Sequence, residues 1–521
     1  MRLIDYLDKG AMLGAQAPCL TTGENDLSYG EVQCLTYRLS RALARSGVQP
    51  GDKVAVLSSN DPIAFACVFG ISRAGAVWCP INPRNEVAEN RVTLDGFDCR
   101  ALIFHSDYAP MVEKMRPELP KLELLVCLDK TLLYAPALGD WLQGCGDEPI
   151  AIEPSDDIAM IAGTGGTTGQ PKGVMLTGRN LETMTAITLM SYPFEPRPTY
   201  LALAPLTHAA GVLCFPMLSL GGRIVIMAKP DLGEFLDLIA RKRVTHTFLP
   251  PTLIYMLLRH AGLASADLSC LQCFWYGAAP MSAARLEEAI AVIGPVLAQL
   301  FGQTEAPMMI STMAPRDHFR ADGSVARERL SSAGRPAPLV TVAIMDDDGR
   351  LLGPGERGEI VIRSSLVMAG YYKNPEATAE ASRYGWHHTG DIGYLGAGNY
   401  LYIVDRAKDM IITGGFNVYS AEVEQALMEH PAVQDCAVVG LPDDKWGERV
   451  TAVVQLHPGQ SVTEPDLRAF VKAQVGSVKA PKQVEVWPDL PRSKVGKILK
   501  NDVKTRLLSQ AGSGAGPRPS P

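Results

Sequence analysis

The chain has 521 residues, which is long enough for about three packing units of ordinary size. Hydrophobic residues make up 47% and charged residues 20%, as in a globular enzyme, and no apolar run approaches the roughly 18 residues that cross a bilayer, so a disordered chain and a transmembrane protein are both excluded. The net charge of −7 comes from charges of both signs spread along the chain, so no nucleic-acid-binding surface is expected.

The N-terminus and the cysteines bear on compartment. Residues 1–15 place Asp5 and Asp8 inside an apolar pattern, which predicts an amphipathic helix and not a secretory signal. The eleven cysteines are odd in number and lie mostly in apolar runs, as expected for reduced thiols in a cytoplasmic protein. Cys270 and Cys273 form a C-x-x-C that is compatible with redox chemistry or half a metal site. No second pair or nearby histidine completes a zinc set, so we interpret this segment as an ordinary strand.

Strand and helix patterns alternate from residue 29 to residue 260, which predicts an α/β fold with parallel, doubly wound sheets. The expected strands are 53–57, 76–80, 101–104, 123–128, 158–162, 223–227 and 246–249, and the expected helices are 29–46, 62–74, 181–190, 232–241 and 252–260. Short strands at 340–345 and 359–363 predict a small β subdomain. Beyond residue 406 the pattern becomes a compact α+β unit, followed by a Gly/Pro/Ser-rich tail that we expect to be disordered.

The stretch from residue 161 to residue 180 is the most informative. Within it, residues 163–172 contain four glycines, three threonines and one lysine: Gly163, Gly165, Gly166, Gly169, Thr164, Thr167, Thr168 and Lys172. Glycines let successive backbone N–H groups turn toward an anion, threonine hydroxyls add donors, and the lysine supplies a positive charge. A P-loop is excluded because Pro171 precedes the lysine and Gly173 follows it, and the dinucleotide fingerprint requires a glycine where Thr168 stands. A polyphosphate loop is favoured over a flexible linker.

The run T-G-G-T-T-G-Q-P-K-G at residues 164–173 resembles the phosphate-binding signature of the acyl-adenylate-forming (AMP-binding) superfamily, which includes acyl-CoA synthetases and the adenylation domains of peptide synthetases. One departure is Gly165, which stands where many members have serine.

Further motifs follow in the order of that family. Ala204–His208 resembles the segment whose histidine, His208, borders the acyl pocket, and Tyr276–Pro280 resembles the segment whose backbone at Gly277, Ala278 and Ala279 lines the adenine site. Phe301–Glu305 resembles the aromatic-G-x-T-E motif, with Gly302 at its second position. There the resemblance implies that Phe301 stacks on adenine, Thr304 donates to the α-phosphate and Glu305 ligates Mg²⁺.

The C-terminal motifs complete the set. Trp386–Asp391 matches W-x-x-T-G-D, in which Asp391 accepts hydrogen bonds from the ribose hydroxyls, and Asp405–Asp409 matches the hinge, with Arg406 on the ribose-phosphate side and Lys408 as pivot. Pro491–Lys497 resembles P-R-[ST]-x-x-G-K, whose lysine, Lys497, neutralises charge during adenylation. Gly414 and Gly415 resemble the turn along the pantetheine tunnel. Trp446 is expected to help hold CoA, although Val478 stands where CoA-binding relatives often have an aromatic residue.

The resemblance implies a large N-terminal ATP- and acyl-binding domain, residues 1–405, a small mobile C-terminal domain, 406–510, and a disordered tail, 511–521. It implies an ATP- and Mg²⁺-dependent ligase that joins a carboxylic acid to coenzyme A through an acyl adenylate, with Lys497, Thr304, Glu305 and His208 as catalytic residues. The small and apolar residues expected around the acid, His208–Val212, Gly302, Met308 and Met309, favour an aryl, alicyclic or medium-chain acid. A homodimer is compatible with the sequence, which does not determine the oligomeric state.

Three functions are alternatives to a CoA ligase. An amino-acid adenylation domain would need an acidic residue beside Ala209, and the run from His208 to Gly211 offers none. An acyl-AMP ligase that loads a carrier protein is not excluded. A catalytically silent nucleotide sensor would need neither Glu305 nor Lys497, and both are present.

Overall fold

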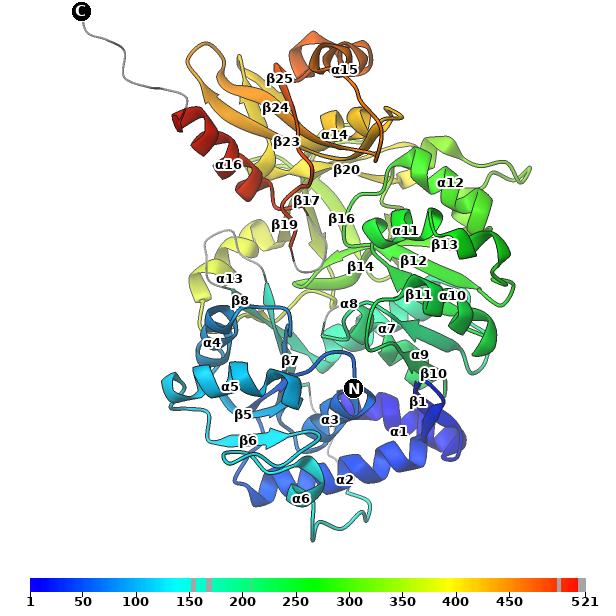
Figure 1. The fold of residues 1–521 in the computed structure, drawn as a ribbon, viewed down its shortest axis with the longest axis vertical. Coiled ribbons are helices and arrows are strands. Elements are labelled where there is room, and N and C mark those ends of the chain that lie inside the picture. Colours follow the sequence, from blue (N-terminus) through cyan, green and yellow to red (C-terminus); the bar gives the residue numbers. More distant parts are fainter. Residues whose placement is uncertain (151–155, 165–170, 208, 494–497, 514–521) are drawn as a thin grey trace, which may run out of the picture.

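The computed structural model describes residues 1–150, 156–164, 171–207, 209–493 and 498–513. Two large sheets with helices on their faces form the N-terminal body, and a smaller α+β unit lies beyond it at the top of Figure 1. Within the described ranges, no helix combines the length and apolar character that crossing a membrane requires. The architecture confirms the expected fold class.

The first sheet has seven strands in the order β18-β8-β7-β4-β3-β5-β6. Its centre is parallel, and the strands β4, β3, β5 and β6 are fully or largely buried because helices cover both faces. The pairs β7–β8 and β8–β18 are antiparallel. The strand bounds are β3 Lys53–Leu57, β4 Val77–Ile81, β5 Cys99–Phe104, β6 Leu124–Cys127, β7 Ile158–Thr164, β8 Lys172–Thr177 and β18 Gly370–Tyr371.

The second sheet has nine strands in the order β15-β14-β13-β12-β11-β9-β10-β1-β2. Strands β13, β12, β11, β9 and β10 run parallel, while β14, β15 and β2 add antiparallel edges. The bounds are β1 Pro18–Thr22, β2 Asn25–Ser28, β9 Thr199–Ala202, β10 Arg223–Ile226, β11 His246–Leu249, β12 Cys273–Gly277, β13 Leu297–Gln303, β14 Ala306–Met313 and β15 Arg335–Pro336.

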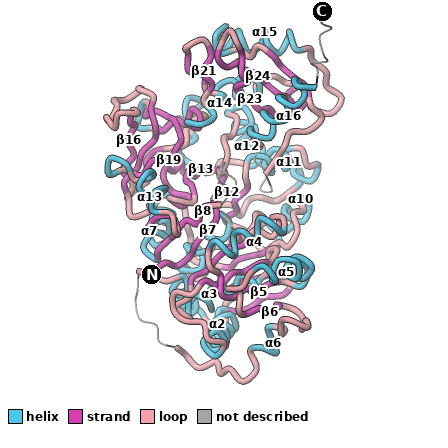
Figure 2. Tube along the Cα trace, turned by 90° about the vertical axis from the view of Figure 1, so that its left-hand side faces the viewer, coloured by secondary structure: helices cyan, strands magenta, loops and turns pink. Residues whose placement is uncertain are grey.

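Helices pack the two sheets into one body. One continuous apolar core joins α1, α2 and α3 to α7 and α9. Helix α3 packs on the seven-stranded sheet, α7 and α9 pack on the nine-stranded sheet, and α1 lies against α2, α3 and α9. Helices α4 and α5 cover the outer face of the first sheet, and α10, α11 and α12 that of the second (Figure 2). The bounds are α1 Leu3–Gly14, α2 Tyr29–Arg45, α3 Pro62–Arg73, α4 Val87–Gly96, α5 Ala109–Met115, α6 Leu138–Trp141, α7 Gly178–Ser191, α8 Ala209–Val212, α9 Cys214–Ser219, α10 Leu232–Arg241, α11 Pro251–Leu258 and α12 Ala283–Ile293.

Local sequence accounts for several helix starts. Ser28 caps α2, where it accepts from the Glu31 backbone N–H while the Glu31 carboxylate reaches back, and Thr177 and Asn180 form the equivalent pair at α7. Asp61 caps α3 ahead of Pro62. These caps fix where each helix leaves its strand.

The remaining N-terminal strands form the small antiparallel subdomain expected from the sequence, in the order β16-β17-β19-β20. Its bounds are β16 Thr341–Met345, β17 Gly358–Arg363, β19 His387–Leu395 and β20 Leu401–Arg406, with α13 Pro375–Ala381 beside it.

The C-terminal unit is built on a mixed sheet in the order β22-β21-β24-β23, with β25 paired to β24. Its elements are β21 Ile411–Thr413, β22 Phe416–Val418, α14 Ser420–Met428, β23 Val433–Asp443, β24 Gly447–Leu456, α15 Glu464–Lys479, β25 Gln483–Val486 and α16 Lys500–Ser513. It has its own apolar cores.

The structure differs from three expectations. The strand β8 and the strand pair β8–β18 were not predicted, because the glycine-rich stretch was expected to lead directly into a helix. The C-x-x-C does not lie in one strand, since Cys270 precedes β12 and only Cys273 belongs to it. Burial raises the pKa of the Cys273 thiol, which therefore stays protonated. Helix α16 continues to Ser513, into the first residues of the expected tail, and 514–521 lie outside the described residues.

Candidate active site

The predicted phosphate loop connects two paired strands in the sequence. Strands β7 and β8 pair in antiparallel register up to Thr164 opposite Lys172, and the Thr164 hydroxyl donates to the Lys172 carbonyl at 3.4 Å. The intervening residues Gly165, Gly166, Thr167, Thr168 and Gly169 lie outside the described residues. The hairpin therefore brings both ends of the predicted phosphate loop to one point at the edge of the seven-stranded sheet.

The aromatic-G-x-T-E motif forms a second hairpin, on the nine-stranded sheet. Phe301 belongs to β13, and Thr304 and Glu305 form the turn that leads into β14. Gly302 has no room for a side chain, because a Cβ there would lie 2.5 Å from the Met308 backbone nitrogen. The close approach bends the strand at an irregularity between Phe301 and Gln303 and presents Thr304 and Glu305 at its end.

The adenine-site segment lies beside that hairpin. Gly277 ends β12 directly opposite Leu300 of β13, and a Cβ on Gly277 would meet the Leu300 carbonyl oxygen at 2.5 Å. Ala278 then turns the chain with a φ of 66°, and Ala279 follows it. Because β12 and β13 are parallel, this turn and Phe301 lie together at the carboxyl ends of their strands, where open α/β sheets bind ligands.

One tyrosine joins the two hairpins. The Tyr371 hydroxyl donates to Oε1 of Glu305 at 2.7 Å, and Nζ of Lys172 lies 5.0 Å from the centre of the Tyr371 ring. Tyr371 belongs to β18, which pairs with β8. The predicted phosphate-binding lysine and the predicted metal ligand thus meet around a residue that the sequence motifs did not identify.

The W-x-x-T-G-D motif reaches the site along β19. Asp391 stands opposite Arg406 in the β19–β20 pair, and its Oδ1 lies 3.4 Å from the Arg406 Nε. Asp391 is buried, whereas the Arg406 side chain is 46% exposed. The guanidinium is therefore placed where it can contact both the carboxylate and a ligand bound to it.

Two histidines that had no predicted role fix this motif. Nε2 of His387 lies 3.1 Å from the Gln303 amide nitrogen, which ties β19 to the Phe301–Glu305 hairpin, and burial lowers the pKa of His387 to about 4, so it is neutral and accepts this hydrogen bond. His388 contacts Glu359 at 2.7 Å, and the same carboxylate accepts from the Gly390 backbone N–H at 2.9 Å. These contacts hold the turn that carries Asp391.

The hinge is anchored on its C-terminal side. Asp405 is buried and accepts from the hydroxyl and backbone N–H of Ser420 at the start of α14. Lys500 pairs with Glu424 of the same helix at 2.8 Å. Burial lowers the pKa of Lys408, which follows the hinge arginine. The catalytic candidate Lys497 lies outside the described residues. Lys500, three residues later in the sequence, forms this buried ion pair.

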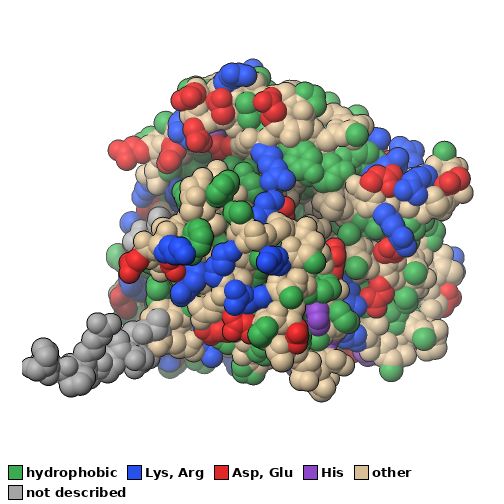
Figure 3. Space-filling view, turned by 90° about the horizontal axis from the view of Figure 1, so that it is seen from above, with side chains coloured by type: hydrophobic (Ala, Val, Ile, Leu, Met, Phe, Trp, Pro, Cys, Tyr) green, Lys and Arg blue, Asp and Glu red, His purple; other side chains and the backbone are tan. Residues whose placement is uncertain are grey.

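The predicted CoA-binding residues are not part of this cluster. Gly414 and Gly415 form the β21–β22 turn with φ values of 58° and 80°, and the Gly414 N–H donates to the Trp446 carbonyl at 2.7 Å. A Cβ on Gly415 would meet nothing within 4 Å. The Trp446 ring is 39% exposed, with Lys445 and Lys482 over its faces. Figure 2 shows β21 in the C-terminal unit, well separated from β7 and β8, and Figure 3 shows lysine and arginine side chains on this end of the molecule.

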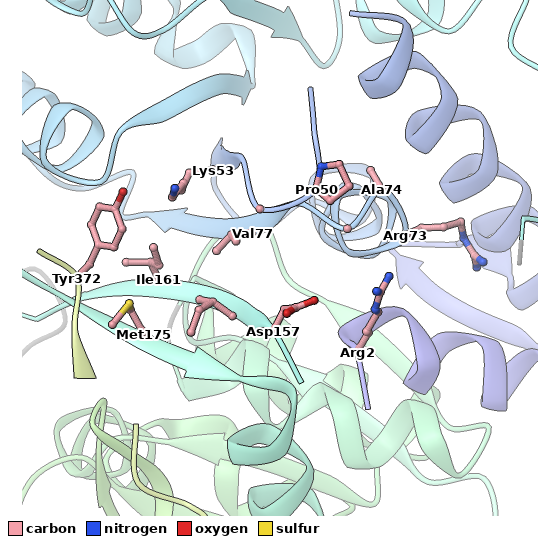
Figure 4. Close-up of a pocket in the computed structure, with 13 residues that line it drawn as sticks. Arg2, Pro50, Lys53, Arg73, Ala74, Val77, Asp157, Ile161, Met175 and Tyr372 are labelled. Carbon is pink, nitrogen blue, oxygen red and sulfur yellow. The ribbon is translucent and has the colours of Figure 1, made fainter. Parts of the chain in front are cut away.

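A cavity of about 500 Å³ lies elsewhere, at the amino ends of β3 and β4 (Figure 4). Lys53, Val77, Ile161, Met175 and Tyr372 are among its lining residues, and none of the predicted site residues is. It is therefore distinct from the site described above. His208 of the predicted acyl pocket lies outside the described residues, and the adjoining helix α8 buries Ala210 and Val212.

The chain matches known protein families over most of its length. The profile of the AMP-binding enzyme family matches residues 7–372, and that of the AMP-binding enzyme C-terminal domain matches residues 422–497. The chain is 36% identical to the medium/long-chain-fatty-acid–CoA ligase FadD8 of Mycobacterium tuberculosis over 519 residues, covering 96% of this chain and 89% of the relative. It is also 36% identical to a feruloyl-CoA synthase of Amycolatopsis sp over 500 residues, covering 95% of this chain and 97% of the relative.

The fold matches solved structures over nearly the whole chain. The amide bond synthetase McbA of Marinactinospora thermotolerans superposes with a TM-score of 0.88 at 31% identity, covering 97% of this chain and 99% of that one. The chain belongs to the AMP-binding enzyme family, and within it to the acyl-CoA synthetase type.

Proposed function

We propose that this acyl-CoA synthetase activates a carboxylic acid whose tail is uncharged and apolar, of the aryl, alicyclic or medium-chain type, and transfers the acyl group to CoA. The observation that carries the activation step is the meeting of Lys172 and Glu305 around Tyr371, because it places a cation and a metal-binding carboxylate at the edge where the phosphate loop ends. That charge pattern suits a polyphosphate with a divalent cation.

The proposed nucleotide contacts are those that the family resemblance implies. Thr164, Lys172 and the residues between them hold the phosphates, and the backbone of Gly277–Ala279 and the ring of Phe301 hold the adenine. Asp391 accepts from the ribose hydroxyls, with Arg406 beside it. Thr304 donates to the α-phosphate, where Lys497 neutralises developing charge and His208 borders the acid. These assignments rest on family resemblance. Thr164, Lys172 and Gly277 stand at strand ends, whereas Asp391 stands in the middle of β19.

Glu305 fits a Mg²⁺ site. Mg²⁺ prefers one or two carboxylates together with substrate phosphates and water. The Glu305 Oε1 is held by Tyr371, so we assign Oε2 to the cation. No group of three or more His, Cys, Asp and Glu side chains that could form a metal site exists in the described part of the chain, so the nucleotide would supply most of the other ligands. When bound, Mg²⁺ supplies neutralisation of phosphate charge.

The reaction has two steps. A carboxylate oxygen of the acid forms a bond to the α-phosphorus of ATP as the bond to pyrophosphate breaks. The CoA sulfur then bonds to the acyl carbon, AMP leaves with the former carboxylate oxygen, and the thiol proton is lost. The first step needs positioning and charge neutralisation rather than a protein nucleophile.

The acid class rests on the side chains of the expected acyl pocket. Met309, Ala210 and Val212 are buried and apolar, and Met308 packs against the main core, so no described member carries a fixed charge. A second carboxylate would be buried there without a partner. Methionine adapts to different shapes, so we expect loose selectivity among apolar acids.

A screen for pyrophosphate release tests the proposal. Benzoate-like acids and acids of six to ten carbons should support release with ATP and Mg²⁺, and malonate and succinate should not. Faster release with either dicarboxylate would contradict the proposed acid class. Thioester formation with CoA, compared with a phosphopantetheinylated carrier protein, separates the proposed acceptor from the carrier-protein alternative.

A further inference from the structure

We infer that Tyr371 is a positioning residue that holds Glu305 ready for the cation and keeps Lys172 apart from it. This inference rests on the proposed function, since it concerns how the same site is prepared for Mg²⁺ and ATP. Neither the phosphate-loop motif nor the aromatic-G-x-T-E motif contains Tyr371. It lies 66 residues beyond its hydrogen-bond partner, Glu305.

Tyr371 lies on a segment that joins the two sheets. We call residues 365–372 the strap. On the side of the nine-stranded sheet, the Met368 N–H donates to the Glu305 carbonyl at 2.8 Å. On the side of the seven-stranded sheet, the strap pairs with β8, where Ala369 N–H donates to the Met175 carbonyl at 3.0 Å and Tyr372 N–H to the Gly173 carbonyl at 2.7 Å. The strap is therefore fixed to both hairpins by backbone hydrogen bonds.

A side chain also secures the beginning of the strap. The Asn180 amide nitrogen donates to the carbonyls of Ser365 and Val367 at 2.9 and 2.7 Å. Asn180 lies in the first turn of α7, where its own oxygen accepts from the Thr177 N–H. The strap thus follows the hairpin β7–β8 and its helix as one body, so the position of Tyr371 relative to Lys172 is well defined.

The hydroxyl of Tyr371 acts on Glu305. A carboxylate has two oxygens, and Oε1 of Glu305 accepts from this hydroxyl at 2.7 Å, which fixes the side chain and leaves Oε2 for a cation. A tyrosine hydroxyl has an ordinary pKa of about 10, so it carries its proton at neutral pH and acts as the donor. Hydrogen-bond partners of metal ligands commonly orient the ligand in this way.

The ring of Tyr371 acts on Lys172. The ammonium lies over the ring face, 5.0 Å from its centre, in a cation–π contact. Lys172 and Glu305, both described, form no ion pair within 4 Å, although they share this one neighbour. If they paired, each would neutralise the other and neither would be available to phosphate or metal. The ring separates them, and the hydroxyl and the ring therefore make distinct contributions.

Two substitutions separate these contributions. Tyr371→Phe keeps the ring and removes the hydroxyl, so we expect the Mg²⁺ concentration for half-maximal pyrophosphate release to rise about tenfold, with most of the rate recovered at saturating Mg²⁺. Tyr371→Leu also removes the aromatic face, so Lys172 is free to pair with Glu305. We expect it to raise the KM for ATP as well, and saturating Mg²⁺ should not restore that loss.

The neighbouring residue provides a matched control. The Tyr372 hydroxyl donates to the Asp98 carboxylate, also at 2.7 Å, and its ring also carries a lysine, Lys53, at 5.1 Å. Figure 4 shows Tyr372 beside Lys53 at the separate cavity. Tyr372→Phe therefore removes an equivalent tyrosine–carboxylate hydrogen bond from the same strap, and we expect the Mg²⁺ requirement to stay within about twofold of wild type.

A binding measurement makes the test independent of turnover. Mn²⁺ binding in the presence of a non-hydrolysable ATP analogue, followed by the relaxation of water protons, should weaken about tenfold in Tyr371→Phe and stay unchanged in Tyr372→Phe. Equal affinity in the two variants, or a loss of rate in Tyr371→Phe that high Mg²⁺ does not restore, would overturn the inference. The proposed acid class fails separately, if no apolar acid supports pyrophosphate release while wild type still binds Mn²⁺ and the analogue.

Discussion

Two parts of the molecule hold their candidate ligand-binding residues differently. One is the junction of the two large sheets, which we call the seam and which carries Glu305 and Lys172; the other is the exposed β21–β22 turn of the C-terminal unit, which carries Gly414 and Gly415. At the seam, Glu305 and Lys172 are fixed by Tyr371 and by a strap hydrogen-bonded to both hairpins. At the turn, Gly415 borders open space and the Phe416 side chain is 59% exposed. Glu305 and Lys172 are therefore fixed by contacts within the body, whereas the turn at Gly415 borders open space.

This difference gives the two-domain division a physical purpose. We propose that residues 406–510 rotate about Lys408 between the two steps, because Lys497 is needed at the phosphate and Gly414–Gly415 at the thiol. Lys500 of α16 pairs with Glu424 of α14, so these two elements of the C-terminal unit move together. Asp405 lies before the pivot and its hydrogen bond to Ser420 crosses it, so the proposed rotation breaks this bond. A rotation at one or two residues between rigid parts is the usual form of a hinge.

The largest effect is expected at Lys497. Lys497→Ala should slow pyrophosphate release roughly 10²–10³-fold, because one electrostatic contact to the developing charge is lost. Thioester formation from supplied acyl-AMP and CoA should remain within a few-fold of wild type. An equal loss in both half-reactions would show that the two regions do not divide the reaction in the way we propose.

The exposed turn should show the opposite pattern. Gly415→Leu places a large side chain in the proposed tunnel and should slow acyl transfer to CoA more than tenfold, with little change in pyrophosphate release. Gly459→Leu is a matched control, because Gly459 lies in the same unit with a φ of 77° and no atom within 4 Å of a Cβ. Both variants carry the same backbone strain. If both impair transfer equally, strain rather than tunnel blockage is responsible, and CoA as acceptor loses its support.

A smaller, pH-dependent effect is expected where the C-terminal unit contacts the N-terminal body. His457 of the C-terminal unit places Nε2 3.1 Å from a nitrogen of Arg259, the residue after α11, and 3.3 Å from a nitrogen of Arg285 in α12. The neutral ring accepts from both guanidinium groups. Burial, and then the two arginines, lower the pKa of His457 from its ordinary value of 6.5. The facing helix α12 carries two acids: Glu288 pairs with Arg285 at 2.7 Å, and Glu287 pairs with Arg327 at 2.6 Å.

The sign follows from the lowered pKa. As pH falls below 6.5, a separated His457 takes up a proton more readily than the docked one, so this orientation of the C-terminal unit is progressively disfavoured. We propose that this orientation serves the adenylation step, and we therefore expect pyrophosphate release between pH 7.5 and pH 5.5 to fall about two- to fivefold more in wild type than in His457→Gln, which keeps an acceptor but does not titrate. The same pH profile in both proteins would contradict this interpretation.

Sequence motifs predicted the parts of the nucleotide site, because each part is a short run whose chemistry is local. Glycines and a lysine between apolar segments indicate a phosphate loop, and Gly302 and Gly277 stand where the strands approach too closely for a Cβ. The alternation of apolar runs likewise determined the parallel sheets and most of their helices.

Only the tertiary structure revealed what holds those parts together. Strand β18 is two residues long, too short for any periodic pattern, and it exists because β8 offers it hydrogen bonds. Tyr371 meets Glu305 and Lys172, and His387 meets Gln303, through contacts between segments far apart in the chain. Local residue chemistry therefore determined which ligand-binding groups this protein carries, whereas pairing between distant strands decided where those groups stand relative to one another.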